Sequence, residues 1–129
     1  MRTTKSIGFA LGIAALSLFL GAPSQAQTVE IGTGIFCNTQ KQIERFVAYF
    51  DGDETTAVNA VNAEENESSA CIHGTVAFFR GPEIETARNK VGAYHILKVI
   101  VVGILTETGL RSAAPAASFS VESVDEREA

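Results

Sequence analysis

The densest run of β-branched residues in the chain is Tyr94–Leu105, and it predicts the central strand of the fold. This run is too short, and at its start too polar, to span a membrane. From Val99 onward the positions on both faces of the strand are apolar, which is typical of a strand that is covered on both sides. Gly103 interrupts the run, and a glycine inside a strand commonly marks a bend or a bulge.

The clearest helical pattern follows Thr39. Thr39 and Gln42 have the spacing of a capping box, in which the two residues satisfy each other's backbone amides. Apolar residues then recur at positions i, i+3, i+4 and i+7 of one helix face: Ile43, Phe46, Val47 and Phe50. A second helix, with a narrower face of alanine and valine, is expected between Asp53 and Asn66. The two helices are close enough in sequence to form a hairpin.

The other segments predict shorter elements. Thr28–Phe36 alternates loosely and indicates a short, irregular strand or arm. Ile72–Phe79 has the composition of a strand, which the following Gly-Pro step is expected to break. Gly81–Gly92 is then a loop that leads into the central strand. Ala113–Ala117 is a connector of small residues, and Phe119–Val124 is a final, half-exposed strand.

Residues 1–26 have the pattern of a signal peptide. A basic start is followed by the apolar stretch Ile7–Leu20, which has fourteen residues, whereas a membrane-spanning helix needs roughly 20. Small residues at the positions before Gln27 suit a signal peptidase. We therefore expect cleavage near Ala26 and one mature domain over 27–129, periplasmic or secreted, without a membrane anchor.

Cys37 and Cys71 are the only cysteines, and they flank the predicted helical hairpin. In an exported chain an even number of cysteines indicates a disulfide, here with a single possible pairing. A metal pair with His73 and a reactive thiol are the rival interpretations, and an oxidising compartment disfavours both. We expect a Cys37–Cys71 disulfide that links the start of the hairpin to the strand after it.

The charge balance excludes some classes of partner. Fifteen acids but only eight of the ten bases follow Ala26, so the mature chain would carry a net charge of −7. A chain with this negative charge offers no positively charged surface that would attract nucleic acid or an anionic membrane. The expected partner is a protein or a small molecule whose identity the sequence does not specify.

The only basic cluster of this acidic chain consists of Arg80, Arg88 and Lys90, in or beside the predicted Gly81–Gly92 loop, and Asn89 lies between the last two. A solvated loop is the simpler interpretation of such residues. Loops held by a rigid sheet are nevertheless where binding residues concentrate. These four residues are the candidate binding site.

Catalytic and cofactor signals are weak. His73 and His95 are the only histidines, and neither belongs to a recognisable catalytic motif. Both could join Cys71 across neighbouring strands to hold zinc, but a structural zinc site normally takes four protein ligands. Gly32–Gly34 contains two glycines of a dinucleotide-binding loop without the third. No catalytic residue, metal ligand or cofactor is assigned.

Several segments together resemble small uncharacterised exported proteins of alphaproteobacteria: Ile35–Val47, Val58–Glu64, Arg80–Glu83 and Ala87–Lys90. The resemblance covers most of the mature chain. It implies an exported protein and brings no activity, cofactor or catalytic residue with it.

The sequence therefore predicts an α+β domain with an N-terminal arm, a helical hairpin and then a three- to four-stranded antiparallel sheet. The bend in the central strand allows a small SH3-like barrel with two helices as the alternative. The favoured function is a non-catalytic module that binds or inhibits another molecule in the periplasm. The alternatives are a small hydrolase-like enzyme that uses His73 or His95, and a structural component of the cell envelope.

Overall fold

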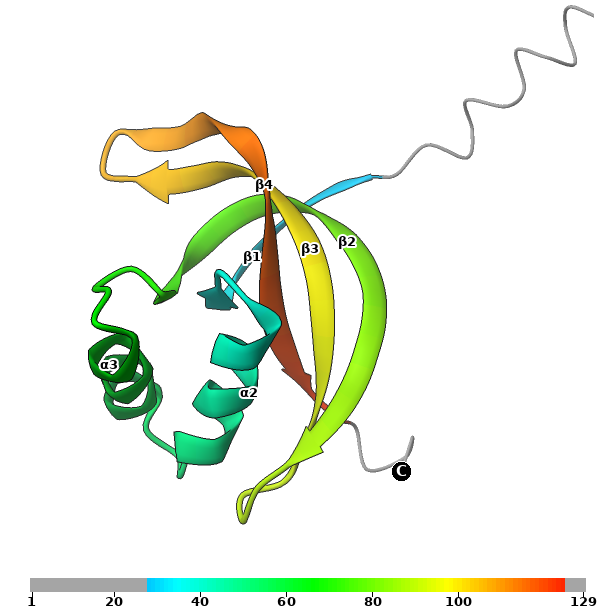
Figure 1. Cartoon of the computed structure of the whole chain (residues 1–129). Coiled ribbons are helices and arrows are strands. Elements are labelled where there is room, and N and C mark those ends of the chain that lie inside the picture. Colours follow the sequence, from blue (N-terminus) through cyan, green and yellow to red (C-terminus); the bar gives the residue numbers. More distant parts are fainter. Residues whose placement is uncertain (1–27, 125–129) are drawn as a thin grey trace, which may run out of the picture.

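Four antiparallel strands and two helices make up the part of the chain that the computed structural model describes, residues 28–124 (Figure 1). The predicted signal peptide and the charged tail after Val124 lie outside these residues. The elements in chain order are β1 (Val29–Cys37), α2 (Gln40–Tyr49), α3 (Glu54–Glu65), β2 (Cys71–Arg88), β3 (Ala93–Thr106) and β4 (Gly109–Ser123). The predicted α+β class is confirmed.

Both helices begin where their capping residues predict. Thr39 Oγ1 accepts a hydrogen bond from the Gln42 amide at 3.1 Å, and Gln42 Oε1 accepts one from the Thr39 amide at 3.0 Å, which completes the capping box at the start of α2. Asp53 accepts the Thr56 amide at the start of α3. α3 ends at Asn66, whose φ of 55° is the left-handed conformation that commonly closes a helix. The helical hairpin is confirmed.

The sheet closes into a barrel in the order β1-β2-β3-β4, with β4 returning to β1. Of the two interpretations of the N-terminal segment, strand or arm, the strand is correct, because all nine residues of β1 pair with β2. The four-stranded antiparallel sheet is confirmed, and its closure agrees with the alternative of a small barrel accompanied by two helices. The hairpin of α2 and α3 is inserted between β1 and β2 and lies against one side of the barrel (Figure 1).

The seam between β1 and β4 is short. Only two residue pairs join these strands, Phe36 with Ser120 and Cys37 with Phe119. Two buried serine side chains of β4 reinforce them: Ser120 Oγ donates to the Ile35 carbonyl at 2.6 Å, and Ser118 Oγ donates to the Cys37 carbonyl at 2.9 Å. N-terminal to this seam, β1 and β4 diverge without pairing.

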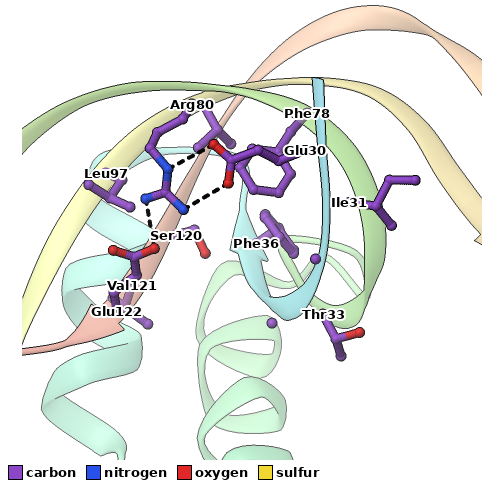
Figure 2. Close-up of a pocket in the computed structure, with 13 residues that line it drawn as sticks. Glu30, Ile31, Thr33, Phe36, Phe78, Arg80, Leu97, Ser120, Val121 and Glu122 are labelled. Atoms are coloured by element: carbon purple, nitrogen blue, oxygen red, sulfur yellow. Dashed lines mark hydrogen bonds and ion pairs between the residues drawn. The ribbon is translucent and has the colours of Figure 1, made fainter. Parts of the chain in front are cut away.

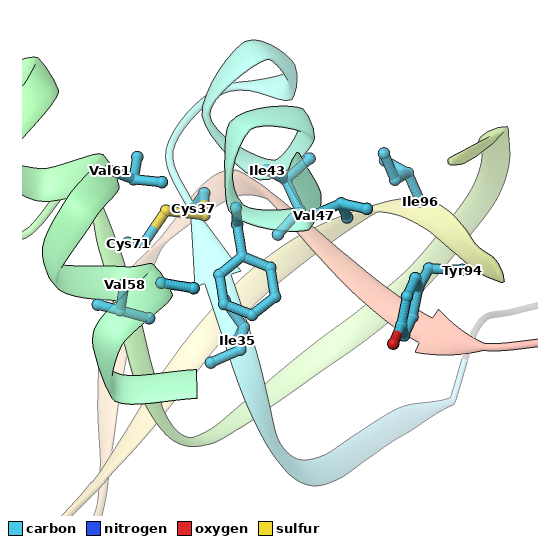
Figure 3. Packing of buried hydrophobic residues seen from close by; sticks show 11 residues of the cluster. Ile35, Cys37, Ile43, Val47, Val58, Val61, Cys71, Tyr94 and Ile96 are labelled. Atoms are coloured by element: carbon cyan, nitrogen blue, oxygen red, sulfur yellow. A yellow bond between two sulfur atoms is a disulfide. The ribbon is translucent and has the colours of Figure 1, made fainter. Parts of the chain in front are cut away.

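The buried residues form two apolar clusters on opposite faces of the strands. One cluster packs α2 and α3 against the outer face of the barrel, with Ile43 and Val61 from the helices and Ile96 from β3 (Figure 3). The other fills the barrel lumen and includes Leu97 and Val99. The central strand is covered on both faces only over its first half, whereas the prediction placed this coverage from Val99 onward. The covered part precedes Ile100, because helices lie only over its first half, and Ile104 is 41% exposed.

The predicted disulfide is confirmed. Cys37 and Cys71 lie directly opposite each other on β1 and β2, with their Cα atoms 4.0 Å apart, and they are bonded. Both side chains are buried in the helix-facing cluster. The bridge therefore holds the two strands together at the point where the chain leaves the sheet to form the helical hairpin.

The predicted break at Gly81–Pro82 and the loop that follows it are wrong, because β2 continues to Arg88. The ladder with β3 shifts register between Arg80 and Glu83, so Pro82 lies in a bulge where no ladder amide is required. Ala113–Ala117, expected as a connector, is likewise part of a strand, β4. The predicted bulge at Gly103 is confirmed by a register shift in both of its ladders.

Gly81→Ala is expected to destabilise the fold by roughly 1 to 3 kcal/mol, as overpacking does, because a Cβ at this position would collide with the backbone carbonyl oxygen of Lys98. Gly74→Ala, the same change in the same strand, is the control, because a Cβ there meets nothing within 4 Å. Thermal unfolding followed by circular dichroism should show a lower Tm for the first variant alone. Equal Tm values would contradict this close approach of β2 and β3.

Candidate functional site

The structure separates the four predicted binding residues into two places. Arg80 lies in the middle of β2, whereas Arg88 ends this strand and is followed by Asn89 and Lys90 in the turn to β3. Arg80 and Arg88 are eight positions apart along an extended strand, a distance of roughly 20 Å or more. The predicted single basic cluster is therefore wrong with respect to Arg80.

Arg80 forms ion pairs with two carboxylates at the mouth of the barrel. Its Nε and Nη2 donate to the two carboxylate oxygens of Glu30 at 3.0 and 3.1 Å, and its Nη1 donates to Glu122 at 2.7 Å (Figure 2). The hydrogen bonds from Arg80 lower the pKa of Glu30 and raise the pKa of Arg80 itself. Because Glu30 belongs to β1 and Glu122 to β4, Arg80 joins the two strands where their ladder is missing.

Asn89 anchors the β2–β3 turn to the end of α2. Its side-chain amide donates to the Val47 and Phe50 carbonyls at 2.8 and 3.1 Å. Its side-chain oxygen accepts the Val91 and Gly92 amides at 2.8 and 3.0 Å. These contacts satisfy the free carbonyls at the helix end and hold the turn against the helix. Asn89 thus has a structural role that orients its two neighbours.

Arg88 and Lys90 are exposed on either side of Asn89 and make no ion pair with any residue between 28 and 124. They line a hollow of about 470 Å³ with the last residues of α2, including Tyr49. The guanidinium of Arg45 lies 4.8 Å from the centre of the Tyr49 ring, and the Tyr49 hydroxyl contacts Glu64, so this wall is fixed. One acid, Asp51, lies in the same hollow.

The two histidines lie in separate pairs. His95 Nδ1 is 2.7 Å from a Glu83 oxygen and 3.5 Å from the Thr86 hydroxyl. A catalytic relay needs the acid on one ring nitrogen and the hydroxyl on the other, whereas here both contact Nδ1. His73 pairs instead with Glu54 on α3 at 3.4 Å. No group of three metal-binding side chains occurs among the described residues, and Cys71 is in the disulfide.

A carboxyl pair between α2 and β2 was not apparent from the sequence. Gln40 Nε2 donates to Glu85 at 2.8 Å and to Glu44 at 3.3 Å. A hydrogen bond with Glu85 raises the pKa of Glu44, while the pKa of Glu85 is lowered. The sequence does not reveal this pair because Glu44 and Glu85 are far apart in the chain, and the helix and the strand that carry them meet only after folding. Gln40, Glu44 and Glu85 do not line either hollow described in this section, and we assign this pair no function.

The mouth of the barrel is a second hollow that sequence reasoning missed. It has a volume of about 160 Å³ and lies between β1 and the end of β4. Phe36, Phe78 and Leu97 line it from the lumen, and Arg80 with its two glutamates lines its rim (Figure 2). Gly32 and Gly34 are also part of the lining. The signal in the sequence was this glycine pair, which is unusual inside a strand.

No family model matches this chain, and no curated protein or solved structure does. The resemblance to exported alphaproteobacterial proteins therefore stays a prediction. Neither described helix has the length and apolar character that crossing a membrane requires.

Proposed function

We propose that this protein is a non-catalytic binding module that captures an acidic partner at the β2–β3 turn. The observation that carries the proposal is the anchored turn, in which four hydrogen bonds of Asn89 hold two cations in place beside an open hollow. A turn that is ordered before binding loses little conformational entropy when a partner docks.

The electrostatics of the surface support an acidic partner. The whole chain has a formal charge of −5, so an acidic molecule is repelled over most of the surface. Arg88 and Lys90 are adjacent cations that no carboxylate of the described residues neutralises. Attraction at one place and repulsion elsewhere give orientation and specificity more than high affinity.

The compartment in this proposal is periplasmic or extracellular. The Cys37–Cys71 disulfide supports it, because such bonds persist mainly in oxidising environments. The predicted signal peptide points to the same compartment.

The double variant Arg88→Glu with Lys90→Glu should fold normally and bind a glutamate-rich acidic peptide at least tenfold more weakly. Reversing two unpaired surface charges removes the attraction and adds repulsion, whereas it breaks no ion pair within 28–124. Binding is measured by titrating the peptide at low salt and following backbone amide resonances, which also shows where the peptide lies. The resonances that move should belong to Arg88–Gly92 and to the end of α2.

Lys98→Glu with Arg111→Glu is the matched control, because it reverses the same number of cations, equally without an ion pair, on β3 and β4. The control and the variants His73→Ala and His95→Ala should keep the wild-type affinity. If the control lost as much affinity for the peptide, the change in net charge alone would explain the weaker binding. That result would contradict a binding site at the turn. Loss of a measurable activity in a histidine variant would favour the enzyme alternative.

A further inference from the structure

One edge of β1 has unpaired backbone groups. The carbonyls of Ile35 and Cys37 point toward β4, where they accept the serine hydroxyls. Backbone groups in a strand alternate in direction, so the amides and carbonyls of Ile31 and Thr33 point to the same side. β4 pairs with no residue of β1 before Phe36. Among residues 28–124, this edge therefore has no strand beside it.

This edge carries few of the features that usually prevent strand pairing. Native proteins protect exposed edges with proline, lysine or other charges. The part of β4 beyond the seam contains Arg111 and Pro115. The open part of β1 contains neither proline nor a basic residue. Its outward side chains are Val29, 47% exposed, Ile31, 64% exposed, and the polar Thr33, while its one charged residue, Glu30, lines the lumen hollow and pairs with Arg80. The two edges that the short seam leaves open thus differ in the protection they carry.

Beside the open edge, two glycines create space in the barrel lumen. Side chains at even positions of β1 point into the lumen, as Phe36 does. Neither Gly32 nor Gly34 has a positive φ, so backbone conformation does not require glycine at either position. Their missing side chains leave the hollow of about 160 Å³ in front of Phe36 and Phe78. A cavity of roughly 150 Å³ can hold a benzene-sized group, so this one can take a single branched or aromatic side chain.

The rim of the hollow is negatively charged. Arg80 is one cation beside two carboxylates, and its Nη1 contacts Oε2 of Glu122. The side chain of Glu122 is 46% exposed. A basic side chain that entered here would meet this carboxylate and an acidic protein around it, whereas an acidic segment would be repelled.

We propose that the open edge of β1, residues Val29–Thr33, binds a basic, extended peptide segment of a partner protein as an added β-strand. The outward backbone groups of Ile31 and Thr33 pair with the peptide backbone. One apolar side chain of the peptide enters the hollow beside Gly32 and Gly34, and a flanking lysine or arginine contacts Glu122. In such strand addition the backbone bonds supply affinity and the pocket supplies specificity. This inference is independent of the acidic partner, because the two sites use different strand ends and opposite charges.

The probe is the capped synthetic peptide Thr-Lys-Val-Thr-Val-Lys-Thr, added to the full mature chain. In the free protein the amides of Ile31 and Thr33 should exchange with solvent much faster than those of Glu30 and Gly32, which face β2. The peptide should slow the exchange of Ile31 and Thr33 at least tenfold and leave their neighbours unchanged. Protection of any other strand edge, or no protection at saturating peptide, would overturn the proposal.

Gly34→Val tests the hollow. A Cβ at this position meets Phe36 and Ser120 at ordinary contact distances of 3.9 and 4.0 Å, so the variant should keep or raise the Tm while its side chain fills the hollow. Peptide affinity should fall at least tenfold. Gly74→Val is the matched control: Gly74 pairs with Gly34 on β2 but does not line the hollow, so affinity should be unchanged. Equal affinities of the two variants would overturn the role of the hollow.

Ile31→Pro tests the edge independently, should Gly34→Val fail to fold. It removes an amide that points away from β2, so the β1–β2 ladder keeps its bonds, whereas the peptide loses a partner. Binding should weaken at least tenfold at an unchanged Tm. Sedimentation analysis of the protein without peptide tests whether a second copy of this chain binds the edge instead. If the wild type is a dimer and Ile31→Pro dissociates it, the edge pairs with a second copy and the peptide proposal is overturned.

Discussion

Replacing Cys37 and Cys71 together by serine is expected to lower the free energy of unfolding by about 3 to 4 kcal/mol. In the chain-entropy model this is the stabilisation from closing a loop of the observed length, with a sequence separation of 34 between the two cysteines. For a domain of this size the loss corresponds to a decrease in Tm of roughly 15 to 25 °C. The segment between the two cysteines contains both helices, so the bridge restricts the conformations that this segment can adopt in the unfolded chain.

Thermal unfolding of the wild type with and without a reductant gives the matched measurement. The reductant should lower the Tm of the wild type nearly to that of the double serine variant and leave the variant unchanged. A variant with the wild-type Tm would show that the strand ladder and the core hold the hairpin without help from the bridge. Alkylation of native wild-type protein should label neither cysteine, because both are bonded.

Ile96→Ala is expected to cost about 2 to 5 kcal/mol, the range for truncating a buried isoleucine. Ile96 is 0% exposed and lies in the cluster between the helices and the barrel. Its strand pairs on one side with β2 and on the other with β4, opposite Glu85 and Val121. Neighbours held on two sides cannot easily collapse into the cavity that the alanine leaves.

Ile104→Ala is the control for this prediction, because it makes the same chemical change in the same strand at a position that is 41% exposed. Its cost should be below about 1 kcal/mol, since no cavity forms at the surface. Chemical denaturation gives both values from the midpoint and the slope of each transition. Equal costs would contradict the division of β3 into a covered first half and an exposed second half.

Features that depend on nearby residues were predictable from the sequence. Thr39 and Gln42 are three residues apart, so their mutual hydrogen bonds need only the first turn of α2. Asp53 caps α3 for the same local reason. The disulfide was predictable because two cysteines allow one pairing. The central strand was predictable because its composition favours strand over helix whatever surrounds it.

The extent of the strands was less predictable. A Gly-Pro step normally ends a strand, and the sequence does not show that a bulge opposite Lys98 accommodates it. β1 was expected as a short, irregular strand or an arm because its two glycines weaken strand propensity. Nine pairs with β2 override this weakness, and those pairs depend on a strand that begins 34 residues after Cys37.

Sequence position also misassigned Arg80. Its charge appeared to belong with Arg88 and Lys90, but its partners Glu30 and Glu122 are 50 and 42 residues away in the chain. Asn89 appeared to be a binding residue, and its four contacts with α2 and the turn show an anchor instead.

The sequence by itself thus determined the helix boundaries, the covalent bridge and the acidic character of this protein, because each follows from residue type or from spacing within a few residues. Only the tertiary structure decided that the sheet closes and that β1 and β4 meet over just two residue pairs. From this short seam follow the open edge of β1, the hollow beside Gly32 and Gly34, and the position of Arg80. All three depend on how few residues of β4 pair with β1, and this pairing is set by strands that are far apart in the sequence rather than by any local pattern.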